Sequence, residues 1–559
     1  MKISKFIVSK LLIGVMALTL FVGCGIKRKE TTTNISADKI KEFSAFFAVA
    51  GKEIPDNNRV KNAIAKKIGA KVNETWLSGQ TAKEKIGAMI ASGKYPDFID
   101  GGDGTQNLVD AGALVPLEDK LDKYPNIKKF WSDNEWDKVK KEDGHIYFIP
   151  QFENVKDDKC TSTSFGGEAF WIQKAVLEWA NYPQIKTLDE YFDVIEKYKA
   201  ANPTINGGTT IGFEILCDDW RYFCLENPPQ FLAGYPNDGK AIVHKETLTA
   251  NSYDLIPEAR KYFKKLNEEY NKGIIDPETF TASYDQYISK LSSGRVLGMI
   301  DQQWEFQNAE WSLKQQNMEE RTYVPLALSF DKEVMTNYRT KLAINPSSGL
   351  GITTSCKDVD GALKVINDLL SNDVIILRNW GEKNIDYKVG SDGVFYRTEE
   401  QRANQNDLQW SNYNMCGYGY FPNYSEGYLD DGINCIINND QVGEFKAGLS
   451  EMDEKVLKGY GFEKWIDFIP NGEEVGAWFP IYSECNTWTS DKPEGIALQK
   501  MREIKREWLP KAIMVEPYEF DSVWNQYQTS LTTQVDINAY EDALTKEVRR
   551  RVKLFSKNE

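Results

Sequence analysis

Residues 42–99 alternate between apolar segments typical of β-strands and amphipathic segments typical of α-helices, and this order constrains the fold more than any other feature. Strands are expected at 42–50, 71–76 and 98–99, with helices at 58–68 and 81–91. Strands that alternate with helices predict an open α/β sheet, and ligands bind such sheets outside the carboxyl ends of the strands. We therefore expect Trp76 and the Gly-rich loop that contains Asp103 to lie near a ligand site.

A second α/β unit is expected after residue 150. The hydroxyl of Thr187 and the carboxylate of Glu190 form a capping box, which predicts that a helix begins here. The strand-like run 295–300 leads directly into Asp301, Gln302, Gln303 and Trp304. Asp219 and Trp220 are a similar combination of polar and aromatic side chains. Both places are therefore candidates for a ligand surface.

Aromatic side chains with polar neighbours indicate the kind of ligand. The chain has 15 Trp, 27 Tyr and 27 Phe, enough to fill a large core and still supply a ligand surface. Sugar rings have apolar faces that stack on aromatic planes, while a few placed polar groups bind the hydroxyls. The candidate binding residues are Trp76, Asp103, Trp171, Asp219, Trp220, Gln303, Trp304, Trp380 and Trp478. A single Trp is more often in the core, so that alternative stays open for each.

The N-terminus has the layout of a secretory signal, with basic residues, the apolar run 11–22 and the small residue Gly23 before Cys24. A cysteine at this point is typical of a bacterial lipoprotein, although Phe21 stands where such signals usually carry Leu. A transmembrane anchor is the alternative, but the run is shorter than the about 20 apolar residues that a spanning helix needs. We expect residues 1–23 to be removed, Cys24 to carry the lipid, and 24–40 to form a flexible tether.

Charge and motif content exclude several functions. The formal net charge of −15 argues against nucleic acid as a partner and against broad contact with anionic lipid. The chain has only two His and lacks the H-E-x-x-H, G-x-S-x-G, P-loop and dinucleotide-binding motifs. We therefore expect no cofactor, no metal and no His-based catalysis. A glycosidase needs only two carboxylates, so this alternative is not excluded.

Eight cysteines do not form a complete disulfide framework if Cys24 is lipidated, because an odd number then remains. Cys217 and Cys224 are close enough in the sequence to pair. Buried thiols are the expected state of these two residues.

Several segments, in order along most of the chain, resemble those of the extracellular solute-binding proteins of bacterial ABC importers. The resemblance is greatest to the large carbohydrate-type lipoproteins of Gram-positive bacteria. The matching segments are 89–99, 108–117, 170–203, 294–300, 380–387 and 520–527. In 380–387, Lys383 and Asn384 stand where a Gly is commoner in the family.

The resemblance implies an α/β, two-lobed periplasmic-binding-protein-like (type II) fold, with hinge-connected lobes and a central ligand cleft. Lobe one would comprise 41–150 and 349–400, and lobe two 151–348 and 401–530, followed by a C-terminal helix at 531–559. Hinge crossings are expected near 150–160, 342–351 and 393–401. Lobes of such proteins close rigidly about a few connecting residues.

The resemblance also implies a function, which is to capture a carbohydrate, in particular an oligosaccharide, and deliver it to the permease subunits of an ABC transporter. The expected protein is a non-catalytic monomer, held on the extracellular side of the cell membrane by its lipid. A surface-anchored glycoside hydrolase or lyase is the first alternative, and an adhesion or structural lipoprotein is the second.

Overall fold

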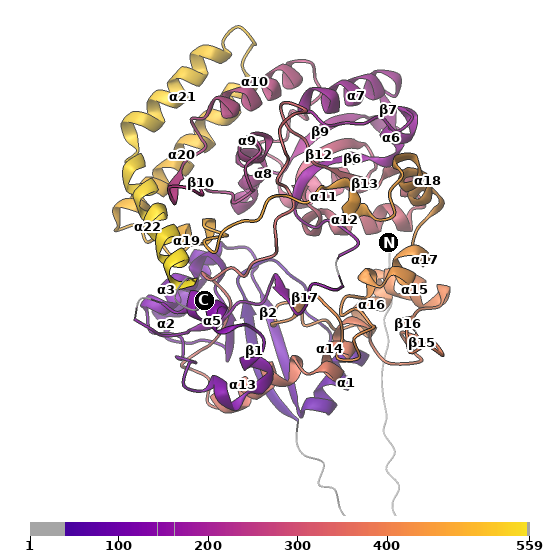
Figure 1. The fold of residues 1–559 in the computed structure, drawn as a ribbon, viewed down its shortest axis with the longest axis vertical. Coiled ribbons are helices and arrows are strands. Elements are labelled where there is room, and N and C mark those ends of the chain that lie inside the picture. The colour runs from indigo at the N-terminus through magenta and orange to yellow at the C-terminus, as the bar shows by residue number, and fades with distance from the viewer. Residues whose placement is uncertain (1–39, 142, 161, 556–559) are drawn as a thin grey trace, which may run out of the picture. The chain divides into compact units, whose positions relative to one another are not determined.

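The computed structural model describes residues 40–141, 143–160 and 162–555. The expected signal 1–23, Cys24 and nearly all of the tether 24–40 lie outside these residues. The described chain contains two larger β-sheets, and each sheet has its own hydrophobic core (Figure 1). Among the described residues, no helix combines the length and the apolar content that crossing a bilayer requires.

The first sheet has the strand order β2-β1-β3-β14-β4. Its strands are β1 (Lys41–Phe47), β2 (Ala70–Trp76), β3 (Phe98–Asp100), β4 (Phe148–Ile149) and β14 (Leu350–Ile352). β1 pairs in parallel with both β2 and β3, so that Phe47 lies opposite Trp76 on one side and Asp100 on the other. Three carboxyl ends therefore meet at one edge of this sheet.

The helices of the first sheet follow from local sequence signals. They are α1 (Arg59–Ile68), α2 (Ala82–Ser92), α13 (Val359–Leu369) and α14 (Asn372–Asn379). Thr81 caps the start of α2 in a capping box with Glu84, and Gly93 ends it with φ 64°, a conformation that Gly adopts without strain. The strand and helix pattern predicted for residues 42–99 is thus confirmed.

The second sheet has the order β13-β6-β12-β9. Its strands are β6 (Glu168–Gln173), β9 (Ile211–Ile215), β12 (Val296–Gln302) and β13 (Tyr323–Leu326). β12 and β9 are parallel, whereas β6 is antiparallel to both of its neighbours. The carboxyl ends of β9 and β12 therefore lie at the same edge, which brings the segments after them together.

Helices surround the second sheet (Figure 1). They include α7 (Leu188–Ala201), α10 (Pro257–Asn271), α11 (Tyr284–Ser292), α12 (Gln303–Gln315), α18 (Glu451–Tyr460), α20 (Pro493–Met514), α21 (Phe520–Gln534) and α22 (Ile537–Phe555). Thr187 and Glu190 form the predicted capping box of α7. Leu544 and Val548 of α22 are buried in the second core, so this helix belongs to that core rather than forming a separate C-terminal element.

The chain passes between the two cores three times. The first crossing lies between Ile149 and Phe165, and the second lies between Tyr338 and Ile344. The third crossing lies between Ile436 and Phe445, because Cys416, Tyr418, Phe421, Tyr424 and Leu429 still pack in the first core. It therefore comes later than the crossing expected at 393–401, and residues 416–436 do not follow their expected assignment to lobe two. The other expected lobe boundaries stay predictions.

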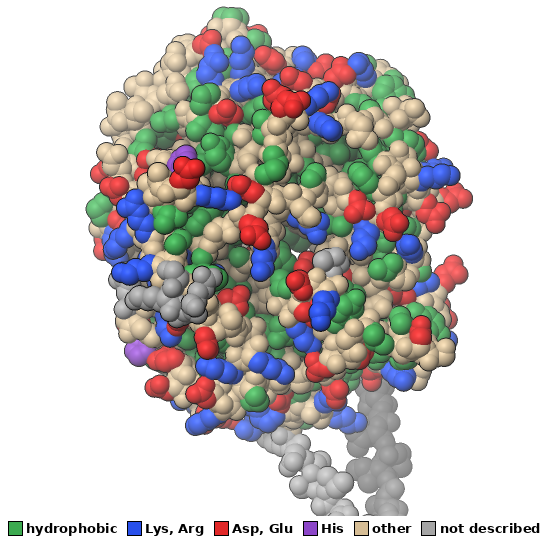
Figure 2. All heavy atoms as spheres, in the orientation of Figure 1, with side chains coloured by type: hydrophobic (Ala, Val, Ile, Leu, Met, Phe, Trp, Pro, Cys, Tyr) green, Lys and Arg blue, Asp and Glu red, His purple; other side chains and the backbone are tan. Residues whose placement is uncertain are grey.

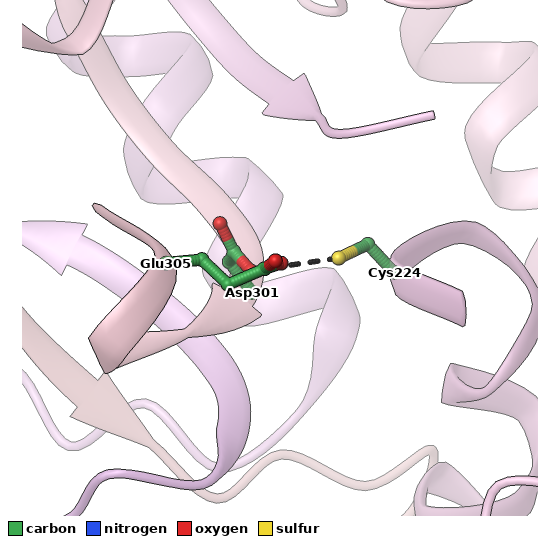
Figure 3. A group of neighbouring side chains, drawn as sticks. All are labelled: Cys224, Asp301 and Glu305. Atoms are coloured by element: carbon green, nitrogen blue, oxygen red, sulfur yellow. Dashed lines mark hydrogen bonds between the residues drawn. The ribbon is translucent and has the colours of Figure 1, made fainter. Parts of the chain in front are cut away.

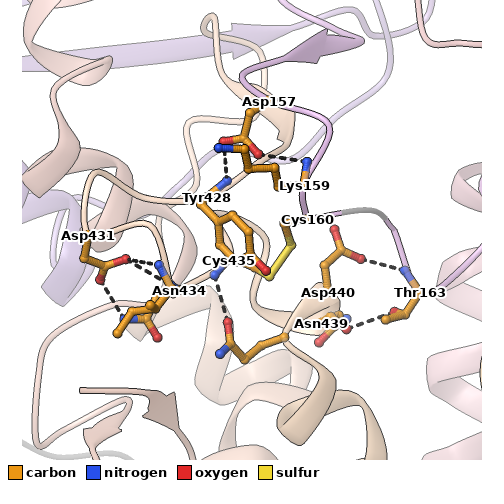
Figure 4. The surroundings of a disulfide bond; sticks show 12 residues. Asp157, Lys159, Cys160, Thr163, Tyr428, Asp431, Asn434, Cys435, Asn439 and Asp440 are labelled. Carbon is orange, nitrogen blue, oxygen red and sulfur yellow. Dashed lines mark hydrogen bonds between the residues drawn. A yellow bond between two sulfur atoms is a disulfide. The ribbon is translucent and has the colours of Figure 1, made fainter. Parts of the chain in front are cut away.

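A disulfide joins Cys160 of the first crossing to Cys435, which directly precedes the third crossing (Figure 4). Beside it, Thr163 donates hydrogen bonds to Asp440 Oδ1 (3.0 Å) and to the carbonyl of Asn439 (2.9 Å). Cys217 and Cys224 are free and buried, which confirms the expectation of buried thiols there. The sequence did not predict the disulfide between Cys160 and Cys435.

Candidate functional site

Two exposed indole rings stack at the edge of the second sheet. Trp220 follows β9 and Trp304 lies in the first turn of α12, directly after β12. Because β9 and β12 are parallel, both residues leave the sheet at the same edge. Their ring centroids are 6.0 Å apart with only 9° between the planes. The two side chains are 40% and 51% exposed, so the pair forms an open aromatic surface.

Arg221 contacts this pair of indole rings and their surroundings. Its guanidinium lies 4.6 Å from the ring centre of Trp220 and 4.2 Å from that of Tyr284, which is the geometry of a cation–π contact on both sides. Its Nε donates to Glu305 Oε1 at 2.9 Å. On the other side, Trp304 Nε1 donates to Gln302 Oε1 at 2.6 Å. The ring of Trp220 is thus contacted by both Arg221 and Trp304, and both indoles are held in place by neighbouring side chains.

A buried pair of carboxyl groups lies below this surface (Figure 3). Asp301 accepts hydrogen bonds from the hydroxyl of Tyr287 (2.6 Å) and from Cys224 Sγ (3.5 Å). Burial raises the pKa of both Asp301 and Glu305, and the charge of Asp301 raises the pKa of Glu305 further. Both carboxyls are therefore harder to ionise than ordinary surface acids.

Cys224, Asp301 and Glu305 together place three ligand atoms within 4.8 Å of one another, as a metal site would. The hydroxyl of Tyr287 and the guanidinium of Arg221 already donate to the two carboxyls. These donors compete with a cation for the same oxygen lone pairs. The arrangement therefore fits a metal centre poorly.

Aromatic residues also cover the carboxyl edge of the first sheet. Trp76 packs against Phe47 and Tyr420, with ring centroids 4.8 and 4.9 Å apart. Tyr420 in turn contacts Phe152, whose side chain is 48% exposed. The Nε1 of Trp76 is buried and has no hydrogen-bond partner among the described residues. The rings of Trp76, Tyr420 and Phe152 form the first wall of the candidate site.

Asp100 adds a polar group to the first wall. Its Oδ2 accepts a hydrogen bond of 2.8 Å from the amide of Gln151, and burial raises its pKa to about 6. The neighbouring carboxyl of Glu153 is reached by solvent but surrounded by protein atoms, and this partial burial raises its pKa to about 7. Both groups therefore titrate near neutral pH rather than as ordinary surface acids.

The second wall, formed by Trp220, Arg221 and Trp304, lies near the first. Burial raises the pKa of Tyr420 to about 12, and the charges of both Asp100 and Arg221 act on its hydroxyl. Asp100 belongs to the edge of the first sheet and Arg221 to the edge of the second. Tyr420 is therefore within electrostatic range of both edges, and we treat the two aromatic walls as one candidate site.

A cavity of about 680 Å³ lies further along α12. Its lining includes Trp311, Lys314 and Gln315 of α12, Asn406 at the end of α15 (Glu399–Asn406), Leu408 and Gln409 of α16 (Leu408–Asn414), and Ser450 before α18. We call this cavity the α12 groove.

On the face drawn in Figure 2, acidic and basic side chains are interspersed among the described residues, without a large patch of either sign.

The structure separates the predicted site residues into two groups. Trp220 and Trp304 come together, and Asp219 is exposed beside them. Gln303 is half-buried and donates to Glu310 Oε2 at 3.0 Å. Asp103 is exposed on the short turn Gly102–Gly104, which follows β3.

Three predicted tryptophans lie in the cores instead. Trp171 contacts Phe306 and donates to the carbonyl of Asp301, and Trp380 is 0% exposed and donates to the carbonyl of Cys435. Trp478 is buried as well. These rings have no open face for a ligand, because packing covers both sides. Polar neighbours in the sequence do not distinguish a Trp ring that lies in the core from one that lies on the surface.

Several residues of the two walls were not among the predicted ones: Phe152, Arg221, Tyr284, Glu305 and Tyr420. Phe152 follows the strand-like run that ends at Pro150, so its position after a strand was a usable signal. Tyr420 lies in a segment without periodicity, and nothing in the sequence places it beside Trp76.

Comparison with known proteins gives a consistent result. Residues 59–376 match the profile of a family described as bacterial extracellular solute-binding protein. FusA of Streptococcus pneumoniae, a fructooligosaccharide ABC transporter substrate-binding protein, is 28% identical over 316 residues, which cover 52% of this chain and 56% of that protein. Lipoprotein LipO of Bacillus subtilis is 21% identical over 433 residues, or 74% of this chain and 80% of that protein.

The fold has solved counterparts as well. An extracellular solute-binding protein from Bifidobacterium longum subsp. infantis matches with a TM-score of 0.62 at 16% identity, covering 92% of this chain and 99% of that one. This likeness confirms the predicted two-lobed α/β fold of the periplasmic-binding-protein type.

Proposed function

This chain belongs to the bacterial extracellular solute-binding protein family, and we propose that it captures an oligosaccharide between its two aromatic walls and delivers it to the permease subunits of an ABC transporter. The stacked, exposed pair Trp220 and Trp304 is the observation that carries the proposal. Parallel indole planes offer a flat apolar surface of the kind on which a sugar ring stacks. The name of FusA supports the same class of ligand.

Polar groups around the rings would bind the sugar hydroxyls. Asp219 is exposed beside Trp220, and Asp103 is exposed on the turn after β3. Asp100 and Gln151 already bind each other at the first wall and leave further donor and acceptor positions. Apolar walls with few placed polar groups are typical of small-molecule sites.

The charge balance of the walls favours a neutral sugar. Arg221 is the cation of the second wall, and its guanidinium is already bound by the carboxyl of Glu305. At the first wall, the ionisable groups described are the acids Asp100 and Glu153. A uronic acid would therefore bring a negative charge toward the acids of the first wall, and the cation beside Asp219, Arg506, belongs to α20 outside the two walls.

We further propose that the protein acts as a receptor and not as an enzyme. The closest pair of carboxyls in the site, Asp301 and Glu305, is covered by protein. A glycosidase needs its two carboxyls on either side of the bond that is cleaved, which buried groups cannot reach. Lipidation of Cys24 would hold the receptor, as a monomer, on the extracellular side of the membrane beside its permease.

Isothermal titration calorimetry on the purified full-length protein tests this function. The panel contains neutral malto-, cello-, xylo- and fructo-oligosaccharides, oligogalacturonides and short peptides. We expect heat from at least one neutral series and none from the oligogalacturonides. Tight binding of peptides without binding of any saccharide would refute the proposal. Release of shortened products from a neutral oligosaccharide, lost on substitution of one Asp or Glu, would establish an enzyme instead.

A further inference from the structure

Building on the proposed capture of an oligosaccharide, we propose that the exposed face of α12 is one continuous binding strip. Trp304 at the start of the helix would hold one end of the sugar chain. The α12 groove, which contains Trp311, would hold residues further along the same chain. The protein would accordingly select sugars by length, and would bind chains that are long enough to reach Trp311 most tightly.

Helix geometry aligns the two tryptophans. At 100° per residue, Trp304, Trp311 and Gln315 lie on one side of α12. The opposite side packs in the core through Glu305, Phe306, Ala309 and Leu313, all of which are buried. With a rise of 1.5 Å per residue, the backbone positions of Trp304 and Trp311 are separated by about 10 Å along the axis. That length exceeds a single sugar ring, so a ligand needs more than one sugar residue to contact both tryptophans.

The α12 groove has the chemistry of a sugar subsite. Trp311 is half-buried and supplies an aromatic wall. The side-chain amides of Asn406 and Gln409 are exposed and have no hydrogen bond within the described part of the chain. Amides are both donors and acceptors, so they can bind neighbouring hydroxyls of one sugar ring. Two of the carboxylates there already have partners, since Asp453 binds Lys174 and Asp407 caps α16, and Glu319 is a further acceptor in the lining.

The groove is bounded by both cores, as the two aromatic walls are. α12 packs in the second core, whereas α16 is tied to the first through Asn58, whose Nδ2 donates to the carbonyls of Asn412 and Met415. Gln315 of α12 reaches across and donates to the carbonyl of Asn406 at 3.3 Å. A sugar in the groove would therefore contact elements of both lobes, and it would reinforce the closure that ligand binding drives.

The test is calorimetry on full-length protein with size series of the malto-, cello-, xylo- and fructo-oligosaccharides, from disaccharide to hexasaccharide. In the wild type, affinity is expected to rise with chain length. Trp311→Ala should weaken the longest sugars about five- to tenfold and leave the shortest bound sugar unchanged. Trp304→Ala should weaken all lengths. Trp311→Phe should retain most of the gain from length, which controls for a folding defect.

Trp179 is the matched control, because it is 49% exposed on the separate helix α6 (Lys174–Trp179). Its substitution by Ala should change no affinity. Equal affinity for short and long sugars in the wild type would overturn the binding strip while leaving the proposed function intact. An equal effect of Trp311→Ala on all lengths would overturn it too. A wild type that binds no saccharide would refute the proposed function and the strip together.

Discussion

Glu168 is a buried carboxyl that should make the protein less stable as the pH rises. It is 4% exposed at the start of β6, and its Oε2 accepts hydrogen bonds from Asn227 (3.0 Å) and Asn237 (2.7 Å). Its Oε1 has no partner among the described residues. Burial raises its pKa from 4.5 to about 8, in spite of the two amide donors. The folded protein thus binds a proton at neutral pH that the unfolded chain releases.

The sign and size of this pH dependence of stability follow from proton linkage. Because the folded pKa is above the unfolded one, the contribution of Glu168 to stability is greatest below pH 4.5 and falls as the pH rises toward 8. One proton gives a slope of about 1.4 kcal/mol per pH unit. The accumulated loss is less than about 1 kcal/mol at pH 5 and about 3 kcal/mol at pH 7.

Glu168→Gln removes this loss of stability and conserves the shape of the side chain. The amide oxygen can accept from Asn227 and Asn237, and the amide nitrogen takes the place of the protonated Oε1. We expect the variant to match the wild type near pH 4.5 and to exceed it by about 3 kcal/mol at pH 7. Urea unfolding followed by circular dichroism, at pH values from 5 to 8, measures the difference.

Glu226 provides the contrasting control in the same core. Burial alone would raise its pKa, but the charges of Lys240 and Lys505 lower it far below its ordinary value. Glu226→Gln should therefore destabilise the protein at pH 7, by roughly 3–5 kcal/mol for a broken buried ion pair. If Glu168→Gln were no more stable than the wild type at pH 8 and showed the same pH slope, the linkage reasoning would be refuted.

Three further predictions concern the anchor, the walls and the disulfide. Cys24→Ser should release the protein into the medium with unchanged sugar affinity, and a fall in affinity would contradict a separate tether and body. Trp220→Ala and Tyr420→Ala should each weaken sugar binding by about 1 kcal/mol in calorimetry, and an unchanged affinity in both would place the sugar elsewhere. Replacing Cys160 and Cys435 together by Ser opens a loop of 275 residues and should lower the free energy of unfolding by up to about 5 kcal/mol. An unchanged urea midpoint would show that this link does not stabilise the fold.

Local signals in the sequence predicted the elements and half of the second wall. Thr187 and Glu190 marked the start of α7 because a capping box depends on four consecutive residues. Trp220 and Trp304 were predicted because each follows acidic or amide side chains in the sequence, and Trp304 also comes just after the strand-like run 295–300. Their mutual stacking needed the strand order β12-β9, which no local signal specifies.

The remaining residues depend on contacts between distant segments. Trp171 and Trp304 are both beside polar residues in the sequence, yet Trp171 is covered by Phe306 and Trp304 is exposed. Tyr420 reaches the first wall because buried Arg378 binds the carbonyls of Gly417, Tyr418, Phe421 and Pro422 around it. A cation that organises a loop through backbone carbonyls leaves no pattern in the loop's own sequence.

The crossings show how the first wall is connected to the hinge. β5 (Asn154–Val155) of the first crossing pairs with β17 (Tyr424–Glu426), which precedes the third crossing. Together with the disulfide and the hydrogen bonds of Thr163, this pairing ties the two crossings into one unit. In the second crossing, Arg339 pairs with Asn471. Phe152 comes two residues before β5, so under the proposed function a sugar that packs on this ring would contact the hinge unit directly. Binding at the first wall and bending of the hinge would then act on the same short segment.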